Sequence, residues 1–86
     1  MNLEQLVLAG RSLRLDKVGD ETFDRVAELA LAMAQERTRR VGGVLTPALA
    51  RPYHEMGETE RLGLRAMAED ITKALVLLGW IDLPGV

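Results

Sequence analysis

The stretch "ETFDRVAELALAMAQERTRR", Glu21 to Arg40, decides the fold class. Its apolar side chains recur at the spacing of one helix face, which predicts a buried stripe. The members of that stripe are Phe23, Val26, Ala27, Ala30, Met33 and Ala34. Acidic residues open the stretch and arginines close it, which complements the helix dipole. Because "VGGV" follows and its glycines accept a positive φ, we predict that this helix ends at Arg40.

Two further helices flank the central one. "MNLEQLVLAGRSLRL", residues 1–15, predicts a helix capped by Asn2 with Gln5 in the reciprocal position and weakened at Gly10. Asp20 is the expected cap of the central helix. The last helix is predicted from Glu58 to Leu78, where Gly79 stops it. Its expected buried stripe is Leu64, Met67 or Ala68, Ile71, Leu75 and Leu78.

The segment between the second and third helices carries two prolines. Thr46 and Pro47 form a cap-and-first-turn pair that starts one short helical turn, and Pro52 breaks anything longer. Apolar side chains are expected to pin this segment to the core: Leu45, Leu49, Tyr53 and Met56. We predict an all-α fold, residues 1–86 in one domain: a small bundle of three main helices with an ordered Pro-containing loop or short helix between the second and third. Residues 82–86 read as a tail.

The composition excludes several classes of protein. There is no cysteine and a single histidine, which argues against disulfides, cysteine catalysis and a structural zinc site. The absence of cysteine suits a reducing cytoplasm. The N-terminus shows no basic stretch followed by an apolar one, and "ALVLLGWI" is too short to span a bilayer. We therefore expect a cytoplasmic protein without a membrane span.

Charge is distributed unevenly along the chain. The net charge is −2, but six arginines against three glutamates give +3 between Arg37 and Arg65. The arginine side chain offers a planar fork of donors for phosphate or carboxylate. Arg37, Arg39, Arg40 and Arg51 flank the glycine break and are candidates for a basic rim together with Arg65; alternatively, they are a solvated helix end.

Candidate ligand-binding residues lie mainly in "ARPYHEMGETERLGLR", residues 50–65. Tyr53 follows a rigid proline and is suited either to stacking on a base or to pinning the loop to the core. Arg65 is suited to binding an anion, or to pairing with a neighbouring carboxylate. Trp80 is a core or interface anchor, or a stacking surface for a ligand. The complete set of predicted ligand-binding residues is Tyr53, Arg65, Arg51, Arg40, Arg37 and Trp80.

Catalysis is not expected. His54 has no neighbouring nucleophile, since Ser12 is the sole serine. Glu55, Glu58 and Glu60 suit a helix start better than acid chemistry or a cation site. We therefore predict no catalytic residue, no metal site and no cofactor.

The segment from Leu29 to Trp80 resembles the small repeat domain of ryanodine receptors, which also occurs alone in bacterial and phage proteins. "RPYHEM", "ETER", Arg65 and "ITKALVLLGW" carry the resemblance. "AQERT", Thr46 before Pro47, and Leu64 before Arg65 depart from the family pattern. Residues 1–19 lie outside it. The resemblance implies a non-catalytic α-helical module that makes protein contacts or senses or sequesters a nucleotide-derived signal.

Two functions are therefore expected from the sequence. The first is a binding module for a nucleotide-like or other anionic small molecule. The alternative is a helical protein-interaction or homo-oligomerisation module, because three apolar helices in a small chain leave surface for a partner. Net acidity and the long gap between the two clear helices argue against a DNA-binding helix-turn-helix.

Overall fold

The computed structural model describes residues 2–15 and 17–83. Over these residues the elements are α1 (Leu3–Ser12), α2 (Asp20–Arg40), the 3-10 turn η1 (Tyr53–Glu55) and α3 (Glu58–Leu77), with no β-strand. The predicted all-α class is confirmed, and so is a short helical turn between the second and third helices. Within the same residues, each helix is too short or too polar to cross a bilayer.

The start of α1 is held by the predicted capping box. The Gln5 amide donates to Asn2 Oδ1 at 2.8 Å, and the Asn2 amide donates to Gln5 Oε1 at 3.0 Å. The helix continues through Gly10 and ends at Ser12. The sequence predicted Asp20 as the cap of α2, and this prediction is wrong. Gly19 occupies that position without a side-chain bond, and Asp20 is the first helical residue, where its charge still favours the helix start.

The other two helix ends share one motif. Gly42 and Gly79 follow the last residues of α2 and α3 with φ of 73° and 74°, as predicted for glycines at these positions. The amide after Gly79, that of Trp80, donates to the Leu75 carbonyl at 3.0 Å. This bond closes a Schellman turn, which satisfies carbonyls left over at the helix end. The predicted ends of both helices are therefore correct to within one residue.

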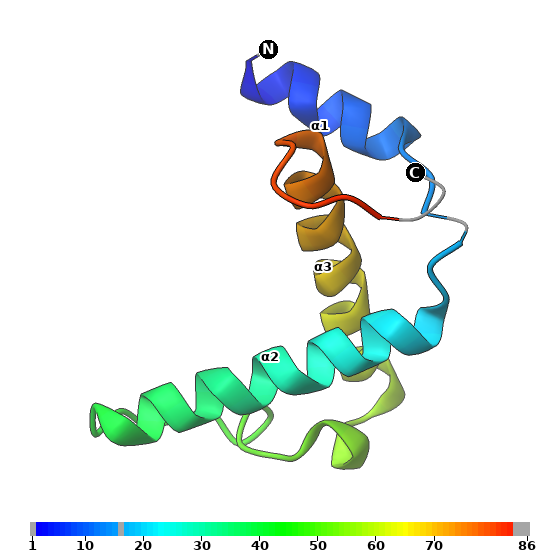
Figure 1. The fold of residues 1–86 in the computed structure, drawn as a ribbon. Coiled ribbons are helices and arrows are strands. Elements are labelled where there is room, and N and C mark those ends of the chain that lie inside the picture. The colour runs from blue at the N-terminus through cyan, green and yellow to red at the C-terminus, as the bar shows by residue number, and fades with distance from the viewer. Residues whose placement is uncertain (1, 16, 84–86) are drawn as a thin grey trace.

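The helices are arranged with α3 as the common support. It packs against α2 near one end and against α1 near the other, while η1 packs on α2. In Figure 1, α2 and α1 lie across opposite ends of α3 and leave its middle open. The buried cluster lies where α2, η1 and α3 meet. Its members are Ala27, Leu31, Tyr53, Met56 and Ala68, with the partly buried Leu64 packed against them.

The buried face of α2 differs from the predicted stripe. Phe23, Ala27 and Leu31 are buried and follow one line at every fourth residue. Val26, Ala30 and Met33 were expected to be buried with them but are exposed, because they lie on the adjacent face and no element covers it.

The buried face of α3 also differs from the predicted stripe. Ala68 is buried, and Leu64 and Leu75 are half-buried. Met67, Ile71 and Leu78 are exposed. The predicted burial of Ile71 and Leu78 is wrong for the single chain, whereas of the two alternatives Met67 and Ala68 the buried residue is Ala68.

The loop before η1 is held at its end rather than at its beginning. Tyr53 and Met56 are buried as expected, Leu45 is half-buried and Leu49 is exposed. The turn at Thr46 is hydrogen-bonded, since its carbonyl accepts from the Leu49 and Ala50 amides at 3.0 Å. It does not extend into a helix.

Candidate functional site

Two of the predicted binding residues, Tyr53 and Arg65, meet on one carboxylate. The Tyr53 hydroxyl donates to Asp24 Oδ1 at 2.6 Å, and Arg65 Nη1 lies 3.7 Å from Asp24 Oδ2. Asp24 belongs to α2, Tyr53 to η1 and Arg65 to α3, so the three side chains join all three elements of the core. Asp24 was not predicted to belong to the site, because the helix dipole already explains a carboxylate near the start of a helix.

The Tyr53 side chain is part of the core. It is 4% exposed. Burial, followed by the hydrogen bond to Asp24, raises the pKa of Tyr53 from 10.0 to about 12. The hydroxyl therefore remains a donor at physiological pH. A ring covered in this way pins η1 and has no open face on which a base could stack.

Arg61 lies one turn before Arg65 on α3 and was also missed. Its carbonyl oxygen is 3.4 Å from the Tyr53 hydroxyl. Its Nε is buried, and no described residue provides it with a hydrogen-bond partner. The guanidinium groups of Arg61 and Arg65 both act on Tyr53, since each lowers the pKa of its hydroxyl against the stronger raising effects. The polar cluster around the Tyr53 hydroxyl thus consists of Asp24, Arg61 and Arg65.

A second carboxylate of α2 binds the next residue of η1. His54 Nε2 contacts Glu28 Oε2, and Arg25 Nη1 lies 3.2 Å from Glu28 Oε1. Because Asp24 and Glu28 are four residues apart, they occupy one face of α2. Two successive residues of η1 therefore attach to two successive turns of α2. The His54 side chain is largely exposed.

The predicted basic rim is not assembled around Arg65. Arg37 and Arg40 lie in the last turns of α2, and at 1.5 Å per residue they are about 20 Å along the helix from Asp24. Arg40 Nε is 3.9 Å from Glu36 Oε1. The carbonyl of Arg51 is held beside the C-terminal half of α2.

Gln35 makes that attachment. Its Nε2 donates to the Leu49 carbonyl at 2.7 Å and to the Arg51 carbonyl at 2.9 Å. One amide thus fixes the end of the loop to α2. No sequence pattern indicated this role, because the partners are fourteen and sixteen residues away.

Trp80 lies at the far end of α3. About 20 Å of helix separates it from Arg65 at 1.5 Å per residue. Its side chain is 73% exposed, so it is not part of the core.

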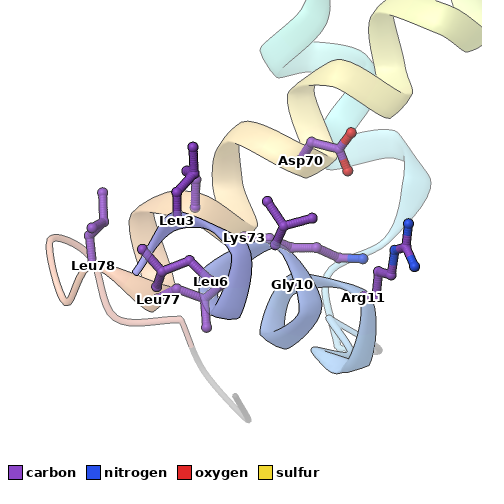
Figure 2. A pocket seen from close by; sticks show the side chains of 10 residues that line it. Leu3, Leu6, Gly10, Arg11, Asp70, Lys73, Leu77 and Leu78 are labelled. Carbon is purple, nitrogen blue, oxygen red and sulfur yellow. The ribbon is translucent and has the colours of Figure 1, made fainter. Parts of the chain in front are cut away.

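A groove runs between α1 and the C-terminal half of α3 (Figure 2). Its volume is about 670 Å³. Its walls are mainly leucine and valine, with charged groups at the rim. The lining residues include Leu3, Leu6, Val7, Leu77 and Leu78, and the charged ones are Arg11, Asp70 and Lys73.

A smaller, more polar hollow of about 380 Å³ lies beside the 13–19 connection. Neither hollow is lined by a predicted binding residue. Among residues 2–15 and 17–83, no group of three or more histidine, cysteine or acidic side chains is placed to hold a metal ion.

Comparisons with protein-family models, with curated proteins and with solved structures found no match to this chain.

Proposed function

We propose that this chain is a helical protein-interaction module whose working surface is the exposed apolar face of α3 with the adjoining wall of α1. The observation that carries the proposal is the distribution of apolar side chains. Among the described residues, fourteen large apolar side chains are exposed and only seven hydrophobic residues, two of them alanines, are buried. Isolated exposed apolar residues are ordinary, but contiguous ones indicate an interaction surface.

The exposed residues of α3 support this function because their spacing is that of a buried stripe. Met67, Ile71 and Leu78 are 58%, 53% and 49% exposed, although the sequence predicts Ile71 and Leu78 to be buried and gives Met67 as an alternative to Ala68. A helix-in-groove or helix-on-helix partner uses anchors at this spacing.

The polar cluster around Asp24 supports the same function indirectly. Its main groups bind one another and join α2, η1 and α3. The contacts of Tyr53 and Arg65 with Asp24 therefore stabilise the packing of these elements. The surface of α3 is thereby held on a fixed scaffold, which lowers the entropic cost of binding a partner.

Methionine oxidation tests this proposal directly. Met67 is exposed on the proposed surface, and Met56 is 4% exposed and provides the buried reference. In cells that produce the protein naturally, brief peroxide treatment should oxidise Met67 several-fold more slowly than in the dilute purified chain. Met56 should be slow in both. Equal rates at Met67 in cells and in the dilute chain would show that nothing covers this surface.

An anion-binding function is the second candidate, and Arg61 is the observation that favours it. Its buried Nε has no partner among the described residues, and the Arg65 guanidinium lies one turn away with a single 3.7 Å carboxylate contact. Two such groups are suited to a phosphate. The resemblance to the ryanodine-receptor repeat supports a nucleotide-derived or other small anionic ligand at this place.

A thermal-shift screen with linear and cyclic nucleotides and inorganic phosphate tests the second candidate. Ligand at 100 times its Kd stabilises the folded chain by about 2.7 kcal/mol. Arg61→Ala with Arg65→Ala should remove the shift. Arg25→Ala is the matched control, because Arg25 also pairs with a carboxylate of α2 but lies outside the cluster. If none of these anions raises the melting temperature, the second candidate is rejected.

A further inference from the structure

We propose that the partner of the exposed α3 face is a second copy of this chain, packed about a two-fold axis that passes near Ile71. This inference rests on the proposed function and specifies its partner. Four features support a second copy: the register of α3, the surface area, the shape of the chain and the charges at the rim of the groove.

The register of α3 matches a helix-pair seam. Leu64, Met67, Ile71, Ala74 and Leu78 follow one another at intervals of three, four, three and four residues. Leu64 packs against the core cluster at one end of this line, and the other four are exposed. This is the alternation of the a and d positions in a heptad. At 100° per residue the last four fall within an arc of about 60°, on one side of the helix. The face is therefore shaped to pack against another helix, and Ile71 is its midpoint.

The single chain exposes more surface than a compact chain of its mass. A compact monomer of 9.5 kDa exposes about 5,000 Å². This chain exposes 6590 Å², an excess of about 1,500 Å². Obligate homodimers bury about 1,000–2,500 Å² on each partner. The excess falls within that range, and it exceeds the roughly 800 Å² that each partner contributes to an interface of standard size.

The extended shape of the chain also supports a second copy as the partner. Its radius of gyration is 14.7 Å, whereas a compact chain of this length has about 12 Å. A compact unit of twice the length has about 15.6 Å. Figure 1 shows the reason, because α1 and α2 extend from opposite ends of α3 and leave its middle bare. A second α3 fits across that bare middle.

The groove between α1 and α3 extends the same surface. Ala74 and Leu78 belong to both the seam and the groove. The rim carries both signs of charge, with Asp70 on one side and Arg11 and Lys73 close by (Figure 2). A two-fold interface brings a patch against itself, so it needs both signs to avoid repulsion. This rim meets that condition.

Sedimentation equilibrium of the full chain provides the first test. We expect a mass of about twice 9.5 kDa at micromolar concentration. Ile71→Glu should lower the association constant by more than 100-fold and leave a helical monomer. Val44→Glu is the matched control, because Val44 is the most exposed large apolar residue described and lies in a loop outside the seam. A dimer that survives Ile71→Glu unchanged would overturn the proposed interface.

Cross-linking provides a second test that does not depend on a stable monomeric variant. The chain has no cysteine, so Ile71→Cys introduces a single thiol. A residue near a two-fold axis faces its own copy. A short bis-maleimide should therefore join two Ile71→Cys chains efficiently and leave Val44→Cys chains unjoined.

The outcomes separate this inference from the proposed function. A wild-type chain that sediments as a monomer at all soluble concentrations, or an Ile71→Cys chain that cross-links no better than Val44→Cys, overturns the second copy as partner. If Met67 is nevertheless protected in cells, the interaction function stands with a different partner. If Met67 is unprotected there as well, both fail.

Discussion

Tyr53→Phe removes the hydroxyl that donates to Asp24 at 2.6 Å and leaves the buried ring in place. A hydrogen bond to a charged group contributes about 1.5–3 kcal/mol to stability. The Asp24 side chain is 41% exposed, so water replaces part of the lost bond and we expect a loss of about 2 kcal/mol. In a domain of this size each kcal/mol lowers Tm by roughly 4–8 °C, which predicts a fall of about 8–16 °C.

The pH dependence of stability tests the environment of the same hydroxyl, which combines its burial with the bond to Asp24. Burial and the bond to Asp24 raise the pKa of Tyr53 from 10.0 to about 12, so the folded chain favours the protonated hydroxyl. The resulting stability is complete below pH 10 and is lost as the pH rises from 10 to 12. Two pKa units correspond to at most about 2.7 kcal/mol, and the bond to Asp24 accounts for only part of this because burial is the larger cause. Tyr53→Phe should lack this loss.

Urea unfolding at several pH values measures the coupling free energy between Tyr53 and Asp24. The chains compared are the wild type, Tyr53→Phe, Asp24→Asn and the double variant. The double variant corrects for changes that each substitution causes alone. Tyr53 is the only tyrosine, so the phenolate absorbance reports its pKa without overlap. A Tyr53→Phe chain within about 0.5 kcal/mol of the wild type, or a tyrosine that titrates near its usual value of about 10, would contradict the assigned bond.

Four further substitutions test the architecture. Gly63→Ala should stabilise the chain by about 0.8–1 kcal/mol, because a methyl group meets nothing within 4 Å in the helix. Gly79→Ala makes the same chemical change at a φ of 74° and should destabilise it by about 1–2 kcal/mol, so equal effects in urea unfolding would be contrary to the structure. Gln35→Ala should speed amide exchange at Leu49, since it loses both bonds to the loop; unchanged exchange would refute the attachment. Asn2→Ala should cost α1 about 1 kcal/mol, seen as faster exchange in its first turn, and no change there would contradict the capping box.

The helix ends were largely predictable from sequence because their signals are local. Asn2 with Gln5, and the glycines at 42 and 79, act within four residues of the helix end. The buried faces were less predictable. The leucines and alanines of α2 form overlapping stripes, and only the position of η1 and α3 determines that Leu31 is buried and Met33 is exposed.

The candidate site was predicted only in part. Periodicity and residue type singled out Tyr53 and Arg65, which do meet in space. Their common partner, Asp24, is twenty-nine residues from Tyr53, and no local pattern reports a pairing at that distance. Arg37, Arg40 and Trp80 were grouped with them by charge or aromaticity. The lengths of α2 and α3 separate these three from Arg65 by about 20 Å.

The helix α1 contributes no fully buried residue, and its packing partner among the helices is α3. We expect such an element to open at a lower free energy than the rest of the chain, which would divide the protein into two cooperative units of unequal stability. Detachment of α1 uncovers the C-terminal half of α3 without disturbing the Tyr53–Asp24 bond. The extent of apolar surface that the chain presents is therefore set by a local equilibrium of one short helix.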